Sequence, residues 1–320
     1  MDDVGGDAMQ ATTEEGHASG ECKILCVQRR FGSTLTVMVS EAQTPDDYKH
    51  PRCYTNLHGG CSTRISGEHY LSHSLIKLYT WDDPSVTIQH DHGFGIPRPV
   101  RPKDFVAKVL CTKHNSDLSA ADDAALQFAS FLREIALTYL NGNGEWGTDA
   151  AITISGDDFQ RWVLKLLGTH AAANALSHDG GRVKRKITEE SVHLLLDKAQ
   201  WPETWGLCVA GDPSNSYLHF DPFCDVDKVT TDWCSIYPFF GTEDETLRGG
   251  VAELNGVGFA LTLFNQGREL PEFHRPENPL LGSVQRPSFL AWELDGVQKR
   301  INFTWSDPWP HKSVTFTMRR

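Results

Sequence analysis

The stretch Leu110-Cys111-Thr112-Lys113-His114-Asn115-Ser116-Asp117-Leu118 combines a metal-ligand spacing with the start of a helix. Cys111 and His114 are separated by two residues, a spacing that puts two zinc donors on one turn. From Asn115 to residue 140 the apolar residues recur at intervals of three and four, which predicts a long amphipathic helix. The run Asn-Gly-Asn-Gly at 141–144 is expected to end this helix and to mark a domain boundary.

Two further cysteines lie upstream of this stretch. Cys53 and Cys61 enclose seven residues that include two adjacent glycines, a loop long enough to fold back and supply two ligands. Four donors from two turns make a closed tetrahedral zinc site, which stabilises a segment with few apolar residues. The predicted structural zinc ligands are therefore Cys53, Cys61, Cys111 and His114. Cys22 and Cys26 remain an alternative to the Cys53 and Cys61 pair.

The composition limits the class of protein. The 320 residues fit one large domain or two ordinary ones, and an apolar fraction of 39% with nine Trp and sixteen Phe supports a sizeable core. Lys and Arg number 30 against 42 Asp and Glu, so the net charge of −12 excludes a generally basic nucleic-acid-binding protein. No run reaches the ~18–20 apolar residues of a membrane span. A soluble, cytoplasmic protein is expected.

The chain is expected to have three regions and an α+β fold. Residues 1–21 are acidic and lack apolar periodicity, which predicts a disordered tail. Residues 22–142 form the metal-bearing region, and residues 145–320 form a second domain that we assign to no family. There we expect helices at 157–167, 171–176 and 188–198, and short apolar runs predict an antiparallel sheet with strands at 206–210, 233–240, 257–264, 288–294 and 314–318.

The polar residues around the zinc ligands follow a distinctive order. Glu68-His69 begins seven residues after Cys61, and Asn115 comes directly after His114. Over residues 53–140 this arrangement resembles the HNH endonuclease family, whose ββα-metal fold carries an acidic-His dipeptide on a zinc-tied hairpin and an Asn at the start of the next helix. The resemblance implies that Glu68 and Asn115 hold a catalytic Mg²⁺ or Mn²⁺ and that His69 is the general base on water. It also implies an inserted loop at 71–110.

The chemistry of phosphodiester hydrolysis suits these residue types. A hard cation neutralises the charge that builds on the phosphoryl and leaving oxygens, and carboxylate and amide oxygens bind such a cation better than thiolates do. An adjacent imidazole, with a pKa near ambient pH, can deprotonate the attacking water. The thiol-rich set and the set of Glu68, His69 and Asn115 would therefore serve two metals with different functions.

The chain departs from the family pattern at several positions. Seven residues separate the first cysteine pair where the family usually has two, and Leu118 stands where a Lys is often found. Residues 71–110 contain no Asn, although the family usually has one that orients the base-bearing loop. Gln89, His90 and Asp91 remain candidates for that orienting role.

Two short basic runs are candidate phosphate contacts in an otherwise acidic chain. Arg98, Arg101 and Lys103 lie in the inserted loop, and the second run extends from Arg182 to Lys186. The expected partner is nucleic acid, DNA rather than RNA. A further protein partner or an oligomer remains open.

Two other interpretations remain open. In the first, the chain is an inactive zinc-stabilised binding or scaffold protein, Glu68-His69 is an exposed strand end, and Asn115 or Ser116 caps a helix. In the second, it is a metal hydrolase that uses His69 together with His90 and His92.

Overall fold

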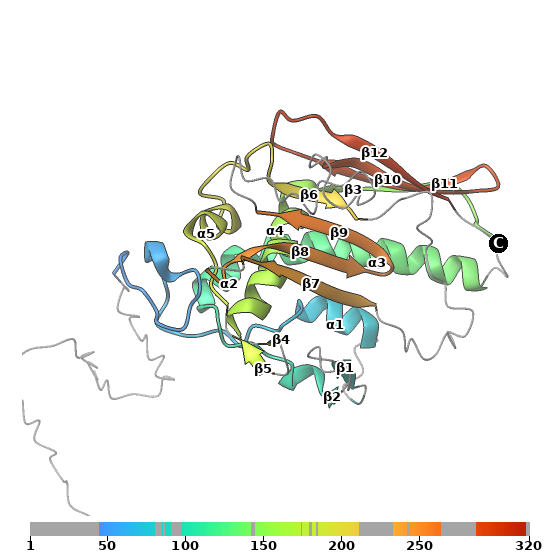
Figure 1. Ribbon diagram of the computed structural model, residues 1–320. Helices are drawn as coiled ribbons and strands as arrows, with labels where there is room; N and C mark the ends of the chain where they lie inside the picture. The colour runs from blue at the N-terminus through green and yellow to red at the C-terminus, as the bar shows by residue number, and fades with distance from the viewer. Residues whose placement is uncertain are drawn as a thin grey trace, which may run out of the picture. The chain divides into compact units, whose positions relative to one another are not determined.

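Figure 1 shows the computed structural model, which describes residues 45–80, 85, 87–90, 98–141, 145–173, 175–178, 181–183, 185–210, 233–241, 244–263 and 286–317. The chain divides into two units, 1–44 and 45–320, and every described residue belongs to the second. The predicted acidic tail, Cys22, Cys26, Asp91, His92 and the predicted boundary at 142–144 lie outside the described residues.

Five α-helices are present in the described part of the chain. They are α1 (His73–Thr80), α2 (Thr112–Asp117), α3 (Ser119–Asn141), α4 (Gly156–Ala172) and α5 (Glu189–Leu195), with short 3-10 helices η1 (Asn56–His58) and η2 (Pro102–Asp104). None of these helices is long and apolar enough to span a membrane.

The helical structure predicted from Asn115 to residue 140 is confirmed. It is divided at Leu118 into two helices, α2 and α3. Helices are also confirmed over 157–167 and within 188–198. Side-chain caps start both: Ser155 accepts from the Asp158 amide at 3.1 Å, and Thr188 accepts from the Ser191 amide at 3.2 Å. The helix predicted at 171–176 is wrong, because α4 continues to Ala172 and a strand follows.

The strands form two four-stranded sheets and two small ladders. The sheets have the orders β6-β9-β8-β7 and β12-β10-β11-β3, and the ladders pair β1 with β2 and β4 with β5. Their bounds are β1 Ile88–His90, β2 Arg98–Val100, β3 Ala150–Ser155, β4 Leu176–His178, β5 Gly181–Val183, β6 Gly206–Val209, β7 Cys234–Phe240, β8 Leu247–Leu254, β9 Val257–Thr262, β10 Pro287–Leu294, β11 Val297–Thr304 and β12 Lys312–Thr317.

The α+β class is confirmed, and each of the five predicted strands corresponds to a strand. The prediction of an antiparallel sheet is right for β6-β9-β8-β7. It is wrong for the other sheet, in which β10 pairs with β12 and β11 with β3 in parallel. Strands β8 and β11 were not predicted. Asn255-Gly256 joins β8 to β9 and Asp295-Gly296 joins β10 to β11, and such dipeptides are sequence signals for a β-hairpin.

Phe159 of α4 lies where the helices and both large sheets meet. Its ring is fully buried, 4.8 Å from the ring of Phe128 on α3, 5.0 Å from Phe259 on β9 and 5.9 Å from Phe303 on β11. Helix α4 also packs along α3 and against β8 (Figure 1). The metal-bearing segment that ends in α3 therefore shares an apolar core with the elements that follow residue 145.

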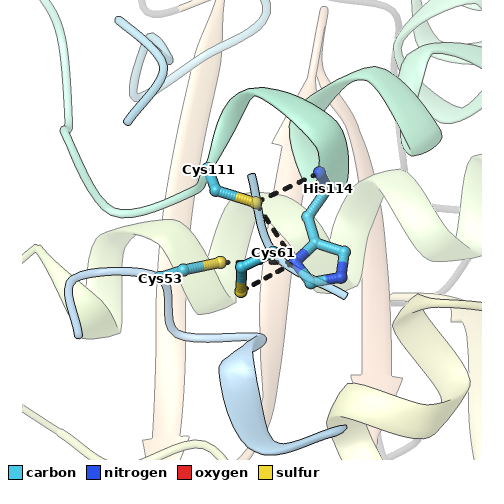
Figure 2. A group of neighbouring side chains, drawn as sticks. All are labelled: Cys53, Cys61, Cys111 and His114. Atoms are coloured by element: carbon cyan, nitrogen blue, oxygen red, sulfur yellow. Dashed lines mark hydrogen bonds between the residues drawn. The ribbon is translucent and has the colours of Figure 1, made fainter. Parts of the chain in front are cut away.

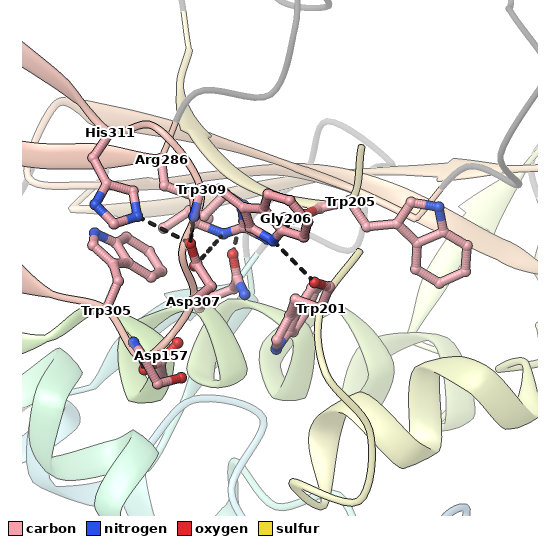
Figure 3. Close-up of polar contacts among 12 residues, drawn as sticks. Asp157, Trp201, Trp205, Gly206, Arg286, Trp305, Asp307, Trp309 and His311 are labelled. Atoms are coloured by element: carbon pink, nitrogen blue, oxygen red, sulfur yellow. Dashed lines mark hydrogen bonds and ion pairs between the residues drawn. The ribbon is translucent and has the colours of Figure 1, made fainter. Parts of the chain in front are cut away.

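Arg286 ties the segment before β6 to the loop before β12 (Figure 3). Its Nη2 donates to the carbonyl of Trp205 at 2.7 Å, and its Nε lies 3.3 Å from Asp307 Oδ2. Asp307 in turn accepts from the Trp309 amide at 2.9 Å, while the Trp305 indole donates to the Pro287 carbonyl. Because the Arg286 side chain is 1% exposed and its guanidinium contacts both segments, this aromatic loop is fixed to the sheet.

Phe159→Ala should lower the free energy of unfolding by about 3–5 kcal/mol, because it leaves a cavity where four elements meet. Urea denaturation followed by circular dichroism measures the change. Tyr237→Ala is the control, since Tyr237 is 61% exposed, and should change the free energy by less than about 0.5 kcal/mol. Equal effects of the two substitutions would contradict the central position of Phe159.

Candidate metal centre

Cys53, Cys61, Cys111 and His114 come together in one buried cluster, the Cys3His cluster (Figure 2). Their ligand atoms all lie within 4.8 Å of one another, and each residue is 2% exposed or less. The sequence prediction of the four residues therefore matches a group that converges in space. It is the one group of three or more His, Cys, Asp or Glu side chains among the described residues whose ligand atoms are arranged to hold a metal ion.

The distances within the cluster fit a tetrahedral zinc ion. His114 Nδ1 lies 3.4 Å from the sulfurs of Cys53 and Cys111 and 3.7 Å from that of Cys61. A tetrahedral ion with ordinary Zn–S and Zn–N bonds would separate a sulfur from a nitrogen by about 3.6 Å. One imidazole nitrogen cannot hydrogen-bond well to three thiols at once, so a shared cation accounts for the arrangement better than hydrogen bonds do.

The backbone brings the two halves of the cluster together. The segment 64–70 runs antiparallel to residues 105–112, with bridges between Ile65 and Cys111 and between His69 and Val106. Gly59 has a φ of 72°, and a Cβ there would lie 2.9 Å from the backbone of Asp47, so only glycine fits this turn. The turn directs the chain into Cys61, whose amide donates to the Tyr48 carbonyl.

The three cysteines of the cluster differ in how readily they ionise. Burial raises the pKa of Cys53 and raises that of Cys61 to about 12. Burial also opposes ionisation of Cys111, but the amides of His114 and Ser62 outweigh it and its pKa lies below the usual value. Three thiolates without a counter-charge are costly in this buried position, whereas a cation would stabilise them.

His114 has the protonation state that a metal ligand needs. Burial lowers its pKa, and the charge of Lys113 acts in the same direction, so the ring is neutral at neutral pH. Cys111 is the N-cap of α2, the helix that carries His114, because the Cys111 sulfur accepts a hydrogen bond from the His114 amide at 3.4 Å.

Glu68 and Asn115 also converge, and between them lies the ammonium of Lys165. Lys165 Nζ is 2.7 Å from Glu68 Oε1, 3.3 Å from Asn115 Oδ1 and 2.8 Å from Asp122 Oδ2. We call Glu68, Asn115 and Asp122 the oxygen cage. The Lys165 side chain is 4% exposed and that of Glu68 is 8% exposed, so this is a buried ion-pair network.

The sequence analysis missed two members of this network, Asp122 and Lys165. Lys165 stands alone among Leu164, Leu166 and Leu167 in a helix whose neighbours are apolar. A single cation in such a run indicates a buried acidic partner, which is the signal that would have found it. Burial raises the pKa of Glu68, although the charge of Lys165 opposes the rise.

His69 lines a small cavity together with Glu68, Ser72, Trp162 and Lys165. Its Nε2 is buried and has no hydrogen-bond partner among the described residues. Burial lowers its pKa, as does His73, whose ring stacks on it at 4.5 Å, while a hydrogen bond with the Pro102 carbonyl opposes the shift. The imidazole is therefore neutral at neutral pH, and none of the described residues donates a hydrogen bond to the lone pair of Nε2.

The described arginines and lysines of the two predicted basic runs differ in exposure and in ion pairing. Arg98, Arg101 and Lys103 are exposed, and Arg101 pairs with Asp104 at 2.6 Å. In the second basic run, Arg185 pairs with a glutamate at 2.9 Å and lies over an aromatic ring, which leaves it poorly placed for phosphate.

Part of the predicted inserted loop is regular structure, because α1 and the β1–β2 ladder lie within 71–110. His90 belongs to β1, and its ring lies 4.7 Å from that of Phe105. The hydrolase interpretation also needs His92, which lies outside the described residues. It therefore gains no support from this region.

Comparisons with protein-family models, with curated proteins and with solved structures found no match to this chain.

The purified chain should hold about one tightly bound zinc ion, and Cys111→Ser should reduce this content and lower the melting temperature by about 10 °C. The reason is that a closed site with three good ligands binds zinc less tightly than one with four. Elemental analysis and thermal unfolding, with and without a chelator, measure both effects.

The matched control is Cys208→Ser, because Cys208 lies on β6 outside the Cys3His cluster. It should keep the zinc and the chelator response of the unmodified chain. A purified protein without zinc, or one whose stability ignores the chelator, would contradict a structural metal here.

Proposed function

We propose that this chain is an HNH-type endonuclease that hydrolyses phosphodiester bonds in DNA. In this proposal, residues 53–140 act as a zinc-stabilised ββα-metal module. Glu68 and Asn115 hold a Mg²⁺ or Mn²⁺ ion, and His69 is the general base.

The observation that carries the proposal is the convergence of Glu68 and Asn115 on one positive charge. Their oxygens lie 2.7 Å and 3.3 Å from the same ammonium nitrogen, although the two residues come from segments far apart in the sequence. The Cys3His cluster accounts for the meeting, because Glu68 follows the Cys61 turn and Asn115 follows His114. Oxygen ligands around a cation position are what a hard metal ion requires.

His69 supports the base assignment by its position and its protonation state. It is the neighbour of Glu68 and lines the same cavity as Lys165. The Pro102 carbonyl engages the ring while Nε2 stays without a partner among the described residues, so Nε2 is the atom that would accept a proton from water.

In the reaction, His69 would remove a proton from a water molecule beside the phosphorus and orient it for attack. Glu68 and Asn115 would hold the cation, which when bound neutralises charge on the phosphoryl oxygens and on the leaving oxygen. The exposed Arg98 and Lys103, on either side of Pro102, would contact neighbouring phosphates of the strand.

A second candidate function is the inactive zinc-stabilised binding protein. The specific observation in its favour is Lys165, whose ammonium fills the cation position and neutralises part of the oxygen cage. A lysine that stays in this position would keep the fold of the module and prevent the metal-dependent chemistry.

His69→Ala should reduce nicking of supercoiled plasmid by about a hundred-fold or more in Mg²⁺ or Mn²⁺, because it removes the base. Agarose gels of a time course measure the rate, and zinc content and circular dichroism confirm that the variant is folded. RNA of matched length, assayed in parallel, separates the two nucleic acids.

His193→Ala is the control, since His193 lies on α5 and does not line the cavity. It should nick at the unmodified rate. Nicking that survives His69→Ala would refute the assignment of His69 as the general base. An absence of nicking by the unmodified chain with every metal would favour the inactive binding protein.

A further inference from the structure

The oxygen cage around Lys165 has the makeup of a cation site rather than of a simple salt bridge. Two carboxyl groups and one amide oxygen face a single ammonium, so one ammonium compensates only one of the two carboxylates when both are ionised. Burial raises the pKa of Glu68, which means that its carboxylate lacks full compensation in this position. A doubly charged ion would match the two carboxylates, whereas the lysine compensates only one of them.

Asp122 is held as a ligand would be held. One of its oxygens faces the ammonium at 2.8 Å, and the other accepts from the Ser72 hydroxyl at 2.5 Å. Ser72 Oγ in turn accepts from the Trp162 indole at 3.1 Å. Such outer hydrogen bonds fix the direction of a carboxylate, as they do around metal ligands in general.

Lys165 already acts as a cation bound in this cage. Its three contacts, to Glu68, Asn115 and Asp122, match the three N–H donors of an ammonium. The ammonium and a metal ion cannot share this volume, because both need the same oxygens and repel each other.

We propose that the Lys165 ammonium and a divalent cation are alternative occupants of one oxygen cage, with Asp122 as the third ligand beside Glu68 and Asn115. The inference deepens the proposed function and rests on it only for the cation position. The unmodified chain must break the lysine contacts before it binds metal, so its affinity for Mg²⁺ or Mn²⁺ is reduced by the share of molecules in which the cage is closed.

Lys165→Met tests the competition, because methionine keeps much of the apolar stem and removes the charge. The zinc-loaded variant should bind Mn²⁺ about a hundred-fold more tightly than the unmodified chain, since two charge-assisted hydrogen bonds no longer have to be broken. Electron paramagnetic resonance of free Mn²⁺ measures the affinities. Adding Asp122→Asn to Lys165→Met should abolish most of the gain.

Lys113→Met is the matched control. It removes the same charge from an exposed pair with Asp117, where the lysine side chain is 54% exposed, and should leave Mn²⁺ binding unchanged. A folded Lys165→Met variant with the affinity of the unmodified chain would overturn the proposal, as would an equal gain in the Lys113→Met control.

The unmodified chain provides a second test if Lys165→Met does not fold. An amine-reactive reagent should label Lys165 poorly, and saturating Mn²⁺ should increase this labelling several-fold while that of Lys113 stays constant. Peptide mass spectrometry measures both sites. Labelling of Lys165 that does not respond to Mn²⁺ would overturn the competition.

The two proposals fail differently. Tight Mn²⁺ binding by Lys165→Met without plasmid nicking would leave the oxygen cage in place and remove the nuclease. Nicking that depends on His69, together with Mn²⁺ binding that ignores Lys165, would keep the nuclease and remove the competition.

Discussion

The meeting of three buried thiols with one imidazole is the constraint on which this region depends. Residues 45–70 offer few apolar side chains, yet they hydrogen-bond to residues 105–112, which lead into α2. Burying Cys53 and Cys61 without a cation opposes their ionisation, so a bound metal and the local fold stabilise each other. The same meeting sets the spacing between Glu68 and Asn115, because each is attached to one half of the cluster.

The oxygen cage shows how one local geometry can support two opposite functions. Glu68, Asn115 and Asp122 surround a cation position, which fits metal-dependent hydrolysis, and Lys165 fills that position, which fits a protein that only binds. The two functions differ by the free energy of moving one side chain of α4. Breaking a buried ion pair is costly unless another charge replaces the one that leaves, so in the proposed competition the occupant of the cage would decide between the two functions.

The four residues of the Cys3His cluster were predictable because the spacing within each pair is local and few residue types can bind zinc. The apolar face of α3 was predictable too, since Phe128 and Leu132 obey a helical period and are buried. Lys165 and Asp122 were not found, because their pairing joins two helices and leaves no short-range pattern. The parallel pairing of β3 with β11 has the same cause: register between distant segments is set by tertiary packing, not by either strand alone.

The parallel pairing of β3 with β11 has a consequence for the order in which the chain folds. Strand β3 has β11 as its neighbour in the sheet, and Asn302 bonds to the Ile152 carbonyl across 150 residues of sequence. During synthesis on the ribosome, β3 would emerge long before β11, and its backbone N–H and C=O groups would lack their strand partner until then. Helix α4, which follows β3 directly, can form earlier because its hydrogen bonds are local. Completion of this sheet is therefore expected to be a late and slow event, at which chaperones would have most to protect.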